Sequence, residues 1–148
     1  MNTNWTLRRA VSSDSMTIAN HACYRPEDAS LRQPYADWVR VRIDSEQYVG
    51  MLAVSDGEVV GGAGVVLLDW GPTRANPGGV MGRLVAVYTS CAFRRQGVAR
   101  AFVKSLLDRC EQLGVREFNL GATTEGKGLY LELGFVSYPA EMRRRVPL

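Results

Sequence analysis

The clearest pattern of apolar and polar positions lies between Val98 and Leu113. Apolar residues recur there every three or four positions, which puts them on one face of a helix. They are Ala99, Phe102, Val103, Leu106, Cys110 and Leu113. Lys104 and Asp108 are spaced to pair on the outer face, and Gly114 supplies a C-terminal stop. The segment therefore predicts an amphipathic helix that packs against a core.

Two successive segments, Tyr48–Val54 and Glu58–Leu68, have the composition of strands. Asp56-Gly57 lies between them and predicts a tight hairpin, because glycine tolerates the positive φ that such turns need. A loop is expected at Gly71–Gly79, followed by another strand at Arg83–Tyr88. Three glycines in the second strand permit a close backbone approach there: Gly61, Gly62 and Gly64.

The remaining elements are shorter. We expect a strand at Thr6–Arg9, a helix from Asp14 or Ser15 to about Cys23, a helix from Pro34, a strand at Glu117–Ala122, a helix at Glu125–Leu133, and a closing hairpin made of Phe135–Tyr138 and Met142–Val146. This order predicts an α/β sheet with helices on both faces. The strand–helix–strand unit over residues 83–122 predicts a right-handed parallel crossover.

The composition fits one globular domain spanning residues 1–148. A chain of 148 residues with 46% hydrophobic content can bury a sizeable core. No apolar run reaches the length of a membrane span, and the N-terminus lacks the basic and apolar regions of a secretory signal. We therefore expect a cytoplasmic protein that does not enter membranes.

Charge and side-chain chemistry exclude several classes of function. The net charge is +3, and no aromatic residues interleave with the basic cluster Arg143–Arg145, so a nucleic-acid module is not favoured. The three cysteines have neither metal-ligand spacing nor the even count of a disulfide framework. His21 is the only histidine, so we expect no metal site. A nucleophilic pair of Cys91 and His21 is conceivable from residue type alone.

The segment Arg94–Ala99 has the properties of an anion-binding turn. It joins a strand to the start of the strongest predicted helix, where free backbone N–H groups and the helix dipole favour negative charge. Gly97 has no Cβ to obstruct a diphosphate, and Arg94, Arg95 and Arg100 add positive charge. The turn predicts phosphate binding but does not identify which molecule carries the phosphate.

Two sequence motifs make the predicted function of this turn more specific. The turn resembles motif A of the GCN5-related N-acetyltransferase (GNAT) family, Gln/Arg-x-x-Gly-x-Gly/Ala, and Leu84–Tyr88 resembles the strand before it. Residues 126–135, which include Tyr130 and end in Leu133-Gly134-Phe135, resemble motif B. The resemblance covers about Thr6 to Tyr138, although Asp14–Ser45 matches only in element order. It implies a largely antiparallel mixed sheet that splays apart between the cofactor strand and the next strand.

The resemblance also implies roles for individual residues. The backbone of Val85, Ala86 and Val87 should bind the pantetheine arm of acetyl-coenzyme A, the co-substrate. The turn and helix start should hold its pyrophosphate: Arg94, Arg95, Gln96, Gly97, Val98, Ala99 and Arg100. The Val87 N–H should stabilise the developing oxyanion, and Tyr130 should donate to the departing sulfur.

The acceptor is expected to be a small-molecule amine or a peptide amine, and the chain could form a homodimer. Acceptor-binding residues are sought in the early polar loop and the Gly71–Gly79 loop, as Tyr24, Arg25, Tyr35 and Asp69. Leu84–Tyr88 contains no carboxylate, so the general base is Asp69, Glu27, Asp28 or a water. The alternative function is a non-catalytic sensor or regulatory module that binds acyl-coenzyme A and does not need Tyr130.

Overall fold

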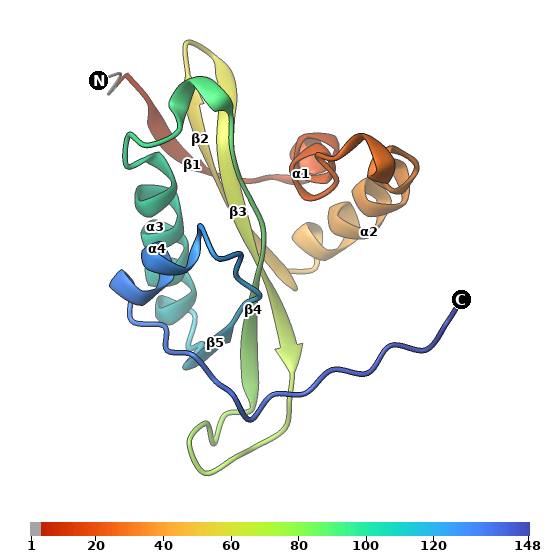
Figure 1. The fold of residues 1–148 in the computed structure, drawn as a ribbon, viewed down its shortest axis with the longest axis vertical. Helices are drawn as coiled ribbons and strands as arrows, with labels where there is room; N and C mark the ends of the chain where they lie inside the picture. Colours follow the sequence, from red (N-terminus) through yellow and green to blue (C-terminus); the bar gives the residue numbers. More distant parts are fainter. Residues whose placement is uncertain (1–3) are drawn as a thin grey trace.

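The structure, a computed structural model, describes residues 4–148 and is built around one five-stranded sheet (Figure 1). Its strands lie in chain order: β1 (Thr6–Arg9), β2 (Tyr48–Ser55), β3 (Glu58–Asp69), β4 (Val80–Thr89) and β5 (Glu117–Asn119). Neighbouring strands are antiparallel except for β4 and β5, which are parallel. The predicted mixed, largely antiparallel sheet is therefore confirmed, as is the parallel crossover over residues 83–122.

Helices cover both faces of the sheet. Helices α1 (Ser15–Ala22) and α2 (Arg32–Asp44) pack on one face, and α3 (Val98–Gln112) packs on the other. The short helix α4 (Lys127–Glu132) lies on the same side as α3. Three short 3-10 helices are also present in the described part of the chain: η1 (Ser12–Asp14), η2 (Pro26–Leu31) and η3 (Cys91–Phe93). No helix within residues 4–148 combines the length and apolar character that crossing a bilayer would require.

Helix α3 supplies most of the larger core. Four side chains of its predicted apolar face have an exposed fraction of 0%: Phe102, Val103, Leu106 and Cys110. Leu113 was expected on that face but is 49% exposed, because the helix ends at Gln112 and Leu113 lies in its C-cap. Lys104 and Asp108 pair on the outer face at 2.9 Å. The helical periodicity was thus right through Cys110 and failed at the end of the helix.

The β2–β3 hairpin forms where the sequence predicts it. Asp56 and Gly57 take φ values of 49° and 79°, the two positive values that a tight turn of this kind requires. On the sheet, Gly64 lies so close to the Tyr48 phenol that a Cβ at this position would stand 1.8 Å from its oxygen. Tyr48 belongs to a second, smaller core that also contains Ile18, Val39 and Leu52. A side chain at position 64 would therefore displace Tyr48 from this core.

The predicted C-terminal hairpin is wrong. Neither Phe135–Tyr138 nor Met142–Val146 forms a strand. After α4 the chain first runs beside β5, and only its end extends away from the body (Figure 1). Three-residue hairpin loops usually place one residue in the left-handed region. The segment Pro139–Ala140 does form a turn, in which the N–H of Glu141 donates to the carbonyl of Tyr138 at 3.3 Å, but it has no residue with positive φ and the segments on its two sides do not pair as strands.

Candidate active site

The site begins where β4 and β5 separate. Their pairing covers only Met81–Arg83 against Glu117–Asn119, and no register pair joins them beyond Arg83 and Asn119. From Leu84 to Thr89, β4 pairs with β3 on one side only. The predicted splay is therefore present, and it leaves one backbone edge of β4 open to a ligand.

A β-bulge interrupts β4 along this open stretch. Gly62 pairs with Tyr88 and Gly64 pairs with Val85, so Ala63 opposes two residues, Ala86 and Val87. Ala86 takes a φ of 55°, which is unusual for a residue with a Cβ. A bulge leaves its extra residue out of the ladder and redirects the neighbouring backbone. The local backbone of Val85–Val87 is thereby turned out of the regular sheet.

The turn before α3 has the backbone shape of an anion cradle. Arg95 and Gly97 take φ values of 61° and 79°, and Gly97 is the N-cap of α3. Left-handed residues beside right-handed ones make neighbouring N–H groups converge. Arg94 fixes the turn because its Nε donates to the carbonyl of Thr89 at 2.9 Å. The cradle is thus tied to the end of β4.

Side chains around the cradle leave it accessible. Arg94, Arg95 and Arg100 are exposed, and Val98 is buried beneath them. Arg100 is held by Glu132 of α4, with Nε and Oε2 3.3 Å apart. The amide of Gln96 donates to the carbonyl of Ala92 at 2.9 Å, while its buried Oε1 has no hydrogen-bond partner among the described residues. Half-buried Ala99 keeps the helix start small.

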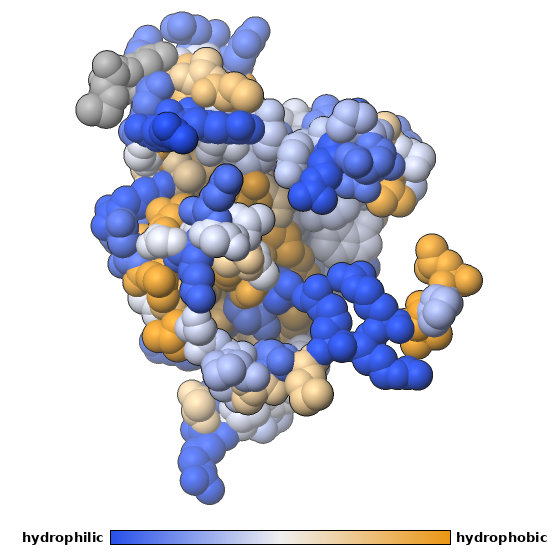
Figure 2. Space-filling model, viewed as in Figure 1, coloured by the Kyte–Doolittle hydropathy of each residue, from blue (hydrophilic) through white to orange (hydrophobic). Residues whose placement is uncertain are grey.

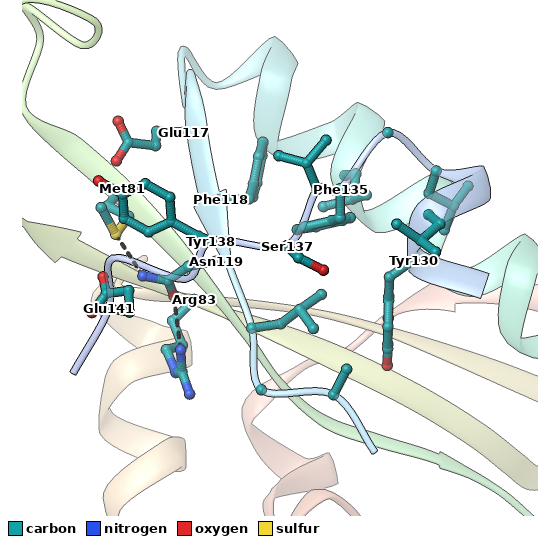
Figure 3. A pocket seen from close by; sticks show the side chains of 18 of the residues that line it. Met81, Arg83, Glu117, Phe118, Asn119, Tyr130, Phe135, Ser137, Tyr138 and Glu141 are labelled. Atoms are coloured by element: carbon teal, nitrogen blue, oxygen red, sulfur yellow. Dashed lines mark hydrogen bonds between the residues drawn. The ribbon is translucent and has the colours of Figure 1, made fainter. Parts of the chain in front are cut away.

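Tyr130 projects from α4 at the edge of the opening beside β5. Its ring meets Phe135 edge to face, with centroids 5.9 Å apart, and in Figure 3 its hydroxyl end points away from Phe135. Partial burial raises the pKa of the Tyr130 phenol. The group is therefore protonated at neutral pH and able to donate a hydrogen bond.

The opening itself has a volume of about 1070 Å³ and lies between β5, α4 and the chain that follows α4. On its floor Arg83 donates to Oδ1 of Asn119 at 3.1 Å, and Nδ2 of Asn119 lies 2.8 Å from the Met81 sulfur (Figure 3). Arg83 and Asn119 are also the last register pair before the strands diverge. The sequence analysis did not single out either residue, because their pairing depends on a register that spans 36 positions.

On the other face of the sheet, aromatic rings gather over the end of β4. His21 of α1 stacks on Tyr88 with centroids 4.7 Å apart, and Tyr24 lies 6.0 Å from the same ring. Burial lowers the pKa of His21 to about 4, so His21 is neutral at physiological pH. Arg25 lies over the Tyr24 ring and donates from Nε to its hydroxyl at 3.3 Å. Two predicted acceptor residues, Tyr24 and Arg25, are therefore brought to the strand that carries the bulge.

The other two predicted acceptor residues lie elsewhere. Tyr35 packs against Trp38 with centroids 5.4 Å apart and adjoins the core beneath α2, and burial raises its pKa to about 12. Asp69 is exposed and pairs with Val80 at the opposite end of the β3–β4 hairpin. Eight residues of strand separate Val80 from Tyr88, which corresponds to about 26 Å. The structure thus does not bring Asp69 near Tyr24.

The sequence analysis missed His21 and Tyr88 as a pair. His21 was considered only as a metal ligand or as the partner of Cys91, and Cys91 is exposed in η3 while His21 is buried. The stacked rings are 67 positions apart, so no local signal joins them. Within residues 4–148, no three or more His, Cys, Asp and Glu side chains are grouped to hold a metal ion.

Comparisons with known proteins agree with this geometry. A predicted acetyltransferase from Clostridium acetobutylicum, solved with acetyl-CoA, matches with a TM-score of 0.86 at 17% identity over 95% of this chain and 96% of that one. A GCN5-related N-acetyltransferase from Ralstonia eutropha matches with a TM-score of 0.86 at 22% identity over 96% and 98%. Glucosamine-6-phosphate N-acetyltransferase from Arabidopsis thaliana matches with a TM-score of 0.72 at 17% identity over 97% and 99%.

Sequence comparison identifies the family directly. No curated protein sequence matches the chain significantly. The model of the acetyltransferase (GNAT) family matches residues 13–135, which is most of the chain and includes the β4 bulge, the cradle before α3 and Tyr130. The chain therefore belongs to the acetyltransferase (GNAT) family.

Proposed function

We propose that the protein is an N-acetyltransferase that moves the acetyl group of acetyl-CoA to a primary amine by direct attack while both substrates are bound. The observation that carries this proposal is the open edge of β4, with its bulge at Ala86, leading into the cradle at Arg95–Gly97. Family membership and a similar fold solved with acetyl-CoA support the choice of co-substrate.

The open edge and the cradle match the two parts of the co-substrate. Pantetheine carries amide groups, which can pair with the backbone of Val85, Ala86 and Val87 as a neighbouring strand would. The diphosphate carries negative charge, which suits the converging N–H groups at Gly97 and Val98 and the dipole of α3. Arg94, Arg95 and Arg100 are exposed beside the cradle and add positive charge.

The thioester supplies an activated acyl group, and the chain's own residues prepare its transfer. Holding both reactants beside the β4 bulge provides proximity and orientation. The Val87 N–H, next to the bulge, donates to the oxygen that becomes negative when the amine attacks the carbonyl carbon. As the bond between that carbon and sulfur breaks, the Tyr130 hydroxyl donates to the leaving thiolate. The raised pKa of Tyr130 keeps this proton on the phenol until then.

The acceptor amine is proposed to approach over Tyr24 and Arg25, close to Tyr88. Its proton is proposed to pass to water, since Asp69 does not lie at the bulge and the other two candidate carboxylates, Glu27 and Asp28, belong to η2 and not to β4. Glu27 is exposed in η2, and Asp69 lies at the far end of β4. His21 is close to Tyr88, but its pKa of about 4 makes it a weak base at neutral pH.

The test is thiol release from acetyl-CoA in the presence of a panel of amines that includes polyamines, amino acids, aminoglycosides and peptide N-termini. The proposal expects at least one amine to raise release above the hydrolysis background, with an N-acetyl product detected by mass spectrometry. Cofactor binding in calorimetry without turnover of any amine would instead favour an acyl-CoA sensor. Failure to bind acetyl-CoA would contradict both functions.

A further inference from the structure

Arg83 is a half-buried cation that the chain itself does not neutralise. No ion pair within residues 4–148 includes it, whereas Arg8 pairs with Asp14. Of the nitrogens of its guanidinium, only Nη1 donates to a described residue, Oδ1 of Asn119, at 3.1 Å. Withdrawing a charge from water is costly unless a partner of opposite charge compensates it. The remaining donors of Arg83 are therefore available to an anion.

Asn119 orients the guanidinium without compensating its charge. Its Nδ2 lies 2.8 Å from the Met81 sulfur, which leaves Oδ1 to accept from Arg83 (Figure 3). An aspartate in this place would form an ion pair, but the neutral amide leaves the guanidinium held and positive. A held, planar guanidinium is suited to bidentate binding of a carboxylate or a phosphate.

The acidic side chains of the same opening do not take this role. Glu117 and Glu141 line the opening with Arg83, but neither forms an ion pair with it in the described part of the chain. In Figure 3 the Glu117 carboxylate points away from the guanidinium, with Asn119 between them. Glu141 is exposed in the segment after α4. The guanidinium therefore borders the opening without a counter-charge. Figure 2 shows how strongly hydrophilic residues alternate with hydrophobic ones over this face of the molecule.

Arg83 lies on the side of β4 from which the acceptor is proposed to approach. It pairs with Val66, which packs on the core beneath α1 and α2 together with Val85. Residues opposite one another in a sheet share a face, so Arg83 projects on the face where His21 stacks on Tyr88. The cradle proposed for the diphosphate precedes α3, which packs on the other face. This position favours the acceptor, and not coenzyme A, as the molecule that carries the anion.

The guanidinium leans along β4 toward the bulge. A Cβ at Gly121, just beyond Asn119 on the chain, would stand 3.6 Å from Nη2 of Arg83. Because β4 and β5 are parallel, this places the guanidinium near the level of Val85, about 7 Å short of Val87 at the rise of a strand. A short molecule with an amine at one end and an anion at the other fits this interval.

We propose that Arg83 binds an anionic group of the acceptor, so that the preferred acceptors are short amines that carry a carboxylate or a phosphate. This inference rests on the proposed acetyl transfer and names its acceptor class. The guanidinium holds the anion while the amine, at the other end of the molecule, reaches the thioester carbonyl beside Val87. Arg83 is then a specificity-determining residue that takes no part in bond formation.

Matched pairs of amines test the preference. Thiol release from acetyl-CoA is measured with glycine, β-alanine and γ-aminobutanoate against their neutral amides, and with phosphoethanolamine against ethanolamine. We expect at least one anionic amine to have a KM about tenfold or more below that of its neutral counterpart. The carboxylate and phosphate series distinguish the two kinds of anion. Equal KM values within every pair would overturn the inference and leave N-acetyl transfer standing.

Two substitutions separate anion binding from a structural role of the pair. Arg83→Gln removes the charge and keeps a donor for Asn119, so KM should rise about tenfold to a hundredfold for anionic amines and less than about threefold for neutral ones. Asn119→Asp supplies an internal counter-charge and should cause the same selective loss without lowering the melting temperature. Arg116→Gln is the matched control, because it removes one exposed charge just before β5, outside the lining of the opening. Equal losses for anionic and neutral amines, or an Asn119→Asp variant that keeps the preference, would contradict anion binding by Arg83.

Two further measurements identify which molecule carries the anion and whether it is turned over. If Arg83→Gln impaired the use of succinyl-CoA and left anionic amines unaffected, the anion would belong to the acyl group, against the inference. Calorimetric titration of the anionic amines in the presence of coenzyme A gives a readout without turnover. Binding that depends on Arg83 but yields no acetylated product would contradict the proposed function and retain the anion site. Absence of binding, or equal binding by the Arg83→Gln variant, would overturn the site.

Discussion

Tyr130 is the residue at which a packing role and a chemical role can be separated most sharply. Tyr130→Phe keeps the ring that meets Phe135 and removes only the hydroxyl. If the phenol donates to the leaving sulfur, turnover should fall by roughly tenfold to a thousandfold, with little change in melting temperature or acetyl-CoA affinity. Steady-state thiol release measures this effect. Tyr138→Phe is the control, because Tyr138 is 69% exposed in the chain after α4 and should retain full turnover.

Gly97 is required for its backbone conformation more than for space. A Cβ at position 97 would meet no atom within 4 Å, but φ is 79°. Gly97→Val therefore strains the turn by about 1–2 kcal/mol and rotates the N–H groups of the cradle. We expect acetyl-CoA affinity to fall about tenfold or more. Gly114→Val is the control, because Gly114 has a φ of 92°, equally open surroundings and a place at the opposite end of α3.

In the control, the same strain should lower the melting temperature and leave affinity unchanged. Equal losses of affinity in both variants would mean that general destabilisation, and not the cradle, weakens binding.

His21 makes stability depend on pH in a defined direction. Burial lowers its pKa from 6.5 to about 4, so the unfolded chain takes up a proton at a higher pH than the folded chain. Neutral His21 makes its full contribution to the free energy of unfolding above pH 6.5. This contribution is lost as the pH falls from 6.5 toward 4, and it changes no further below pH 4. The loss should reach roughly 1–3 kcal/mol. Thermal unfolding across this range measures it, and His21→Phe should flatten the profile while keeping a ring on Tyr88.

At the scale of elements, the proposed acceptor side lies at Tyr24 and Arg25, between α1 and η2, and the proposed cofactor side lies on β4 and α3. Tyr24→Ala and Arg25→Ala should raise the KM for the acceptor about threefold to thirtyfold, because each removes a side chain of the proposed acceptor surface near Tyr88. The KM for acetyl-CoA should stay nearly constant. Initial-rate kinetics with each substrate varied in turn decides this. Arg40→Ala on exposed α2 surface is the control, and parallel changes in both constants would undermine the division.

Elements with a strong local signal were predictable. The apolar face of α3 follows from spacing alone, and the Asp56-Gly57 turn follows from its residue types, which take positive φ values in the structure. The bulge was not predictable, because Leu84–Tyr88 reads as a regular strand and Ala86 gives no sign of a φ of 55°. The C-terminal hairpin was predicted wrongly, because neither Phe135–Tyr138 nor Met142–Val146 forms a strand.

At the scale of the whole molecule, binding should couple to stability. Acetyl-CoA is proposed to fill the open edge of β4 in the folded state only, so it should raise the melting temperature with increasing concentration. At a hundred times the dissociation constant, the stabilisation is about 2.7 kcal/mol. Calorimetric melting over a concentration series measures this. Gly97→Val should need a higher concentration for the same shift, and no shift in the parent protein would contradict cofactor binding.

Only part of the candidate site could be predicted from the sequence, because some of its contacts join residues that are far apart along the chain. Motif residues such as Gly97 and Tyr130 lie in short segments whose local pattern is readable. The contacts between Arg83 and Asn119, and between His21 and Tyr88, join residues 36 and 67 positions apart. Such contacts depend on strand register and helix placement, which the order of elements does not determine. Asp69 illustrates the same limit, because its position at the end of a strand gave no indication that it lies at the opposite end of the β3–β4 pair from Tyr88 and Tyr24.

The open, bulged edge of β4 has a consequence for how such a protein can evolve. Binding of a ligand by backbone N–H and carbonyl groups depends on the path of the backbone and much less on which side chains the residues carry. For the proposed binding of acetyl-CoA, backbone geometry therefore matters most at positions such as Ala86 and Gly97, and side-chain identity matters less along the rest of this edge. Solved structures that share the fold at a TM-score of 0.86 are only 17% and 22% identical to this chain, so the fold tolerates wide change in sequence. It also leaves the acceptor side free to change its substrate without rebuilding the cofactor side.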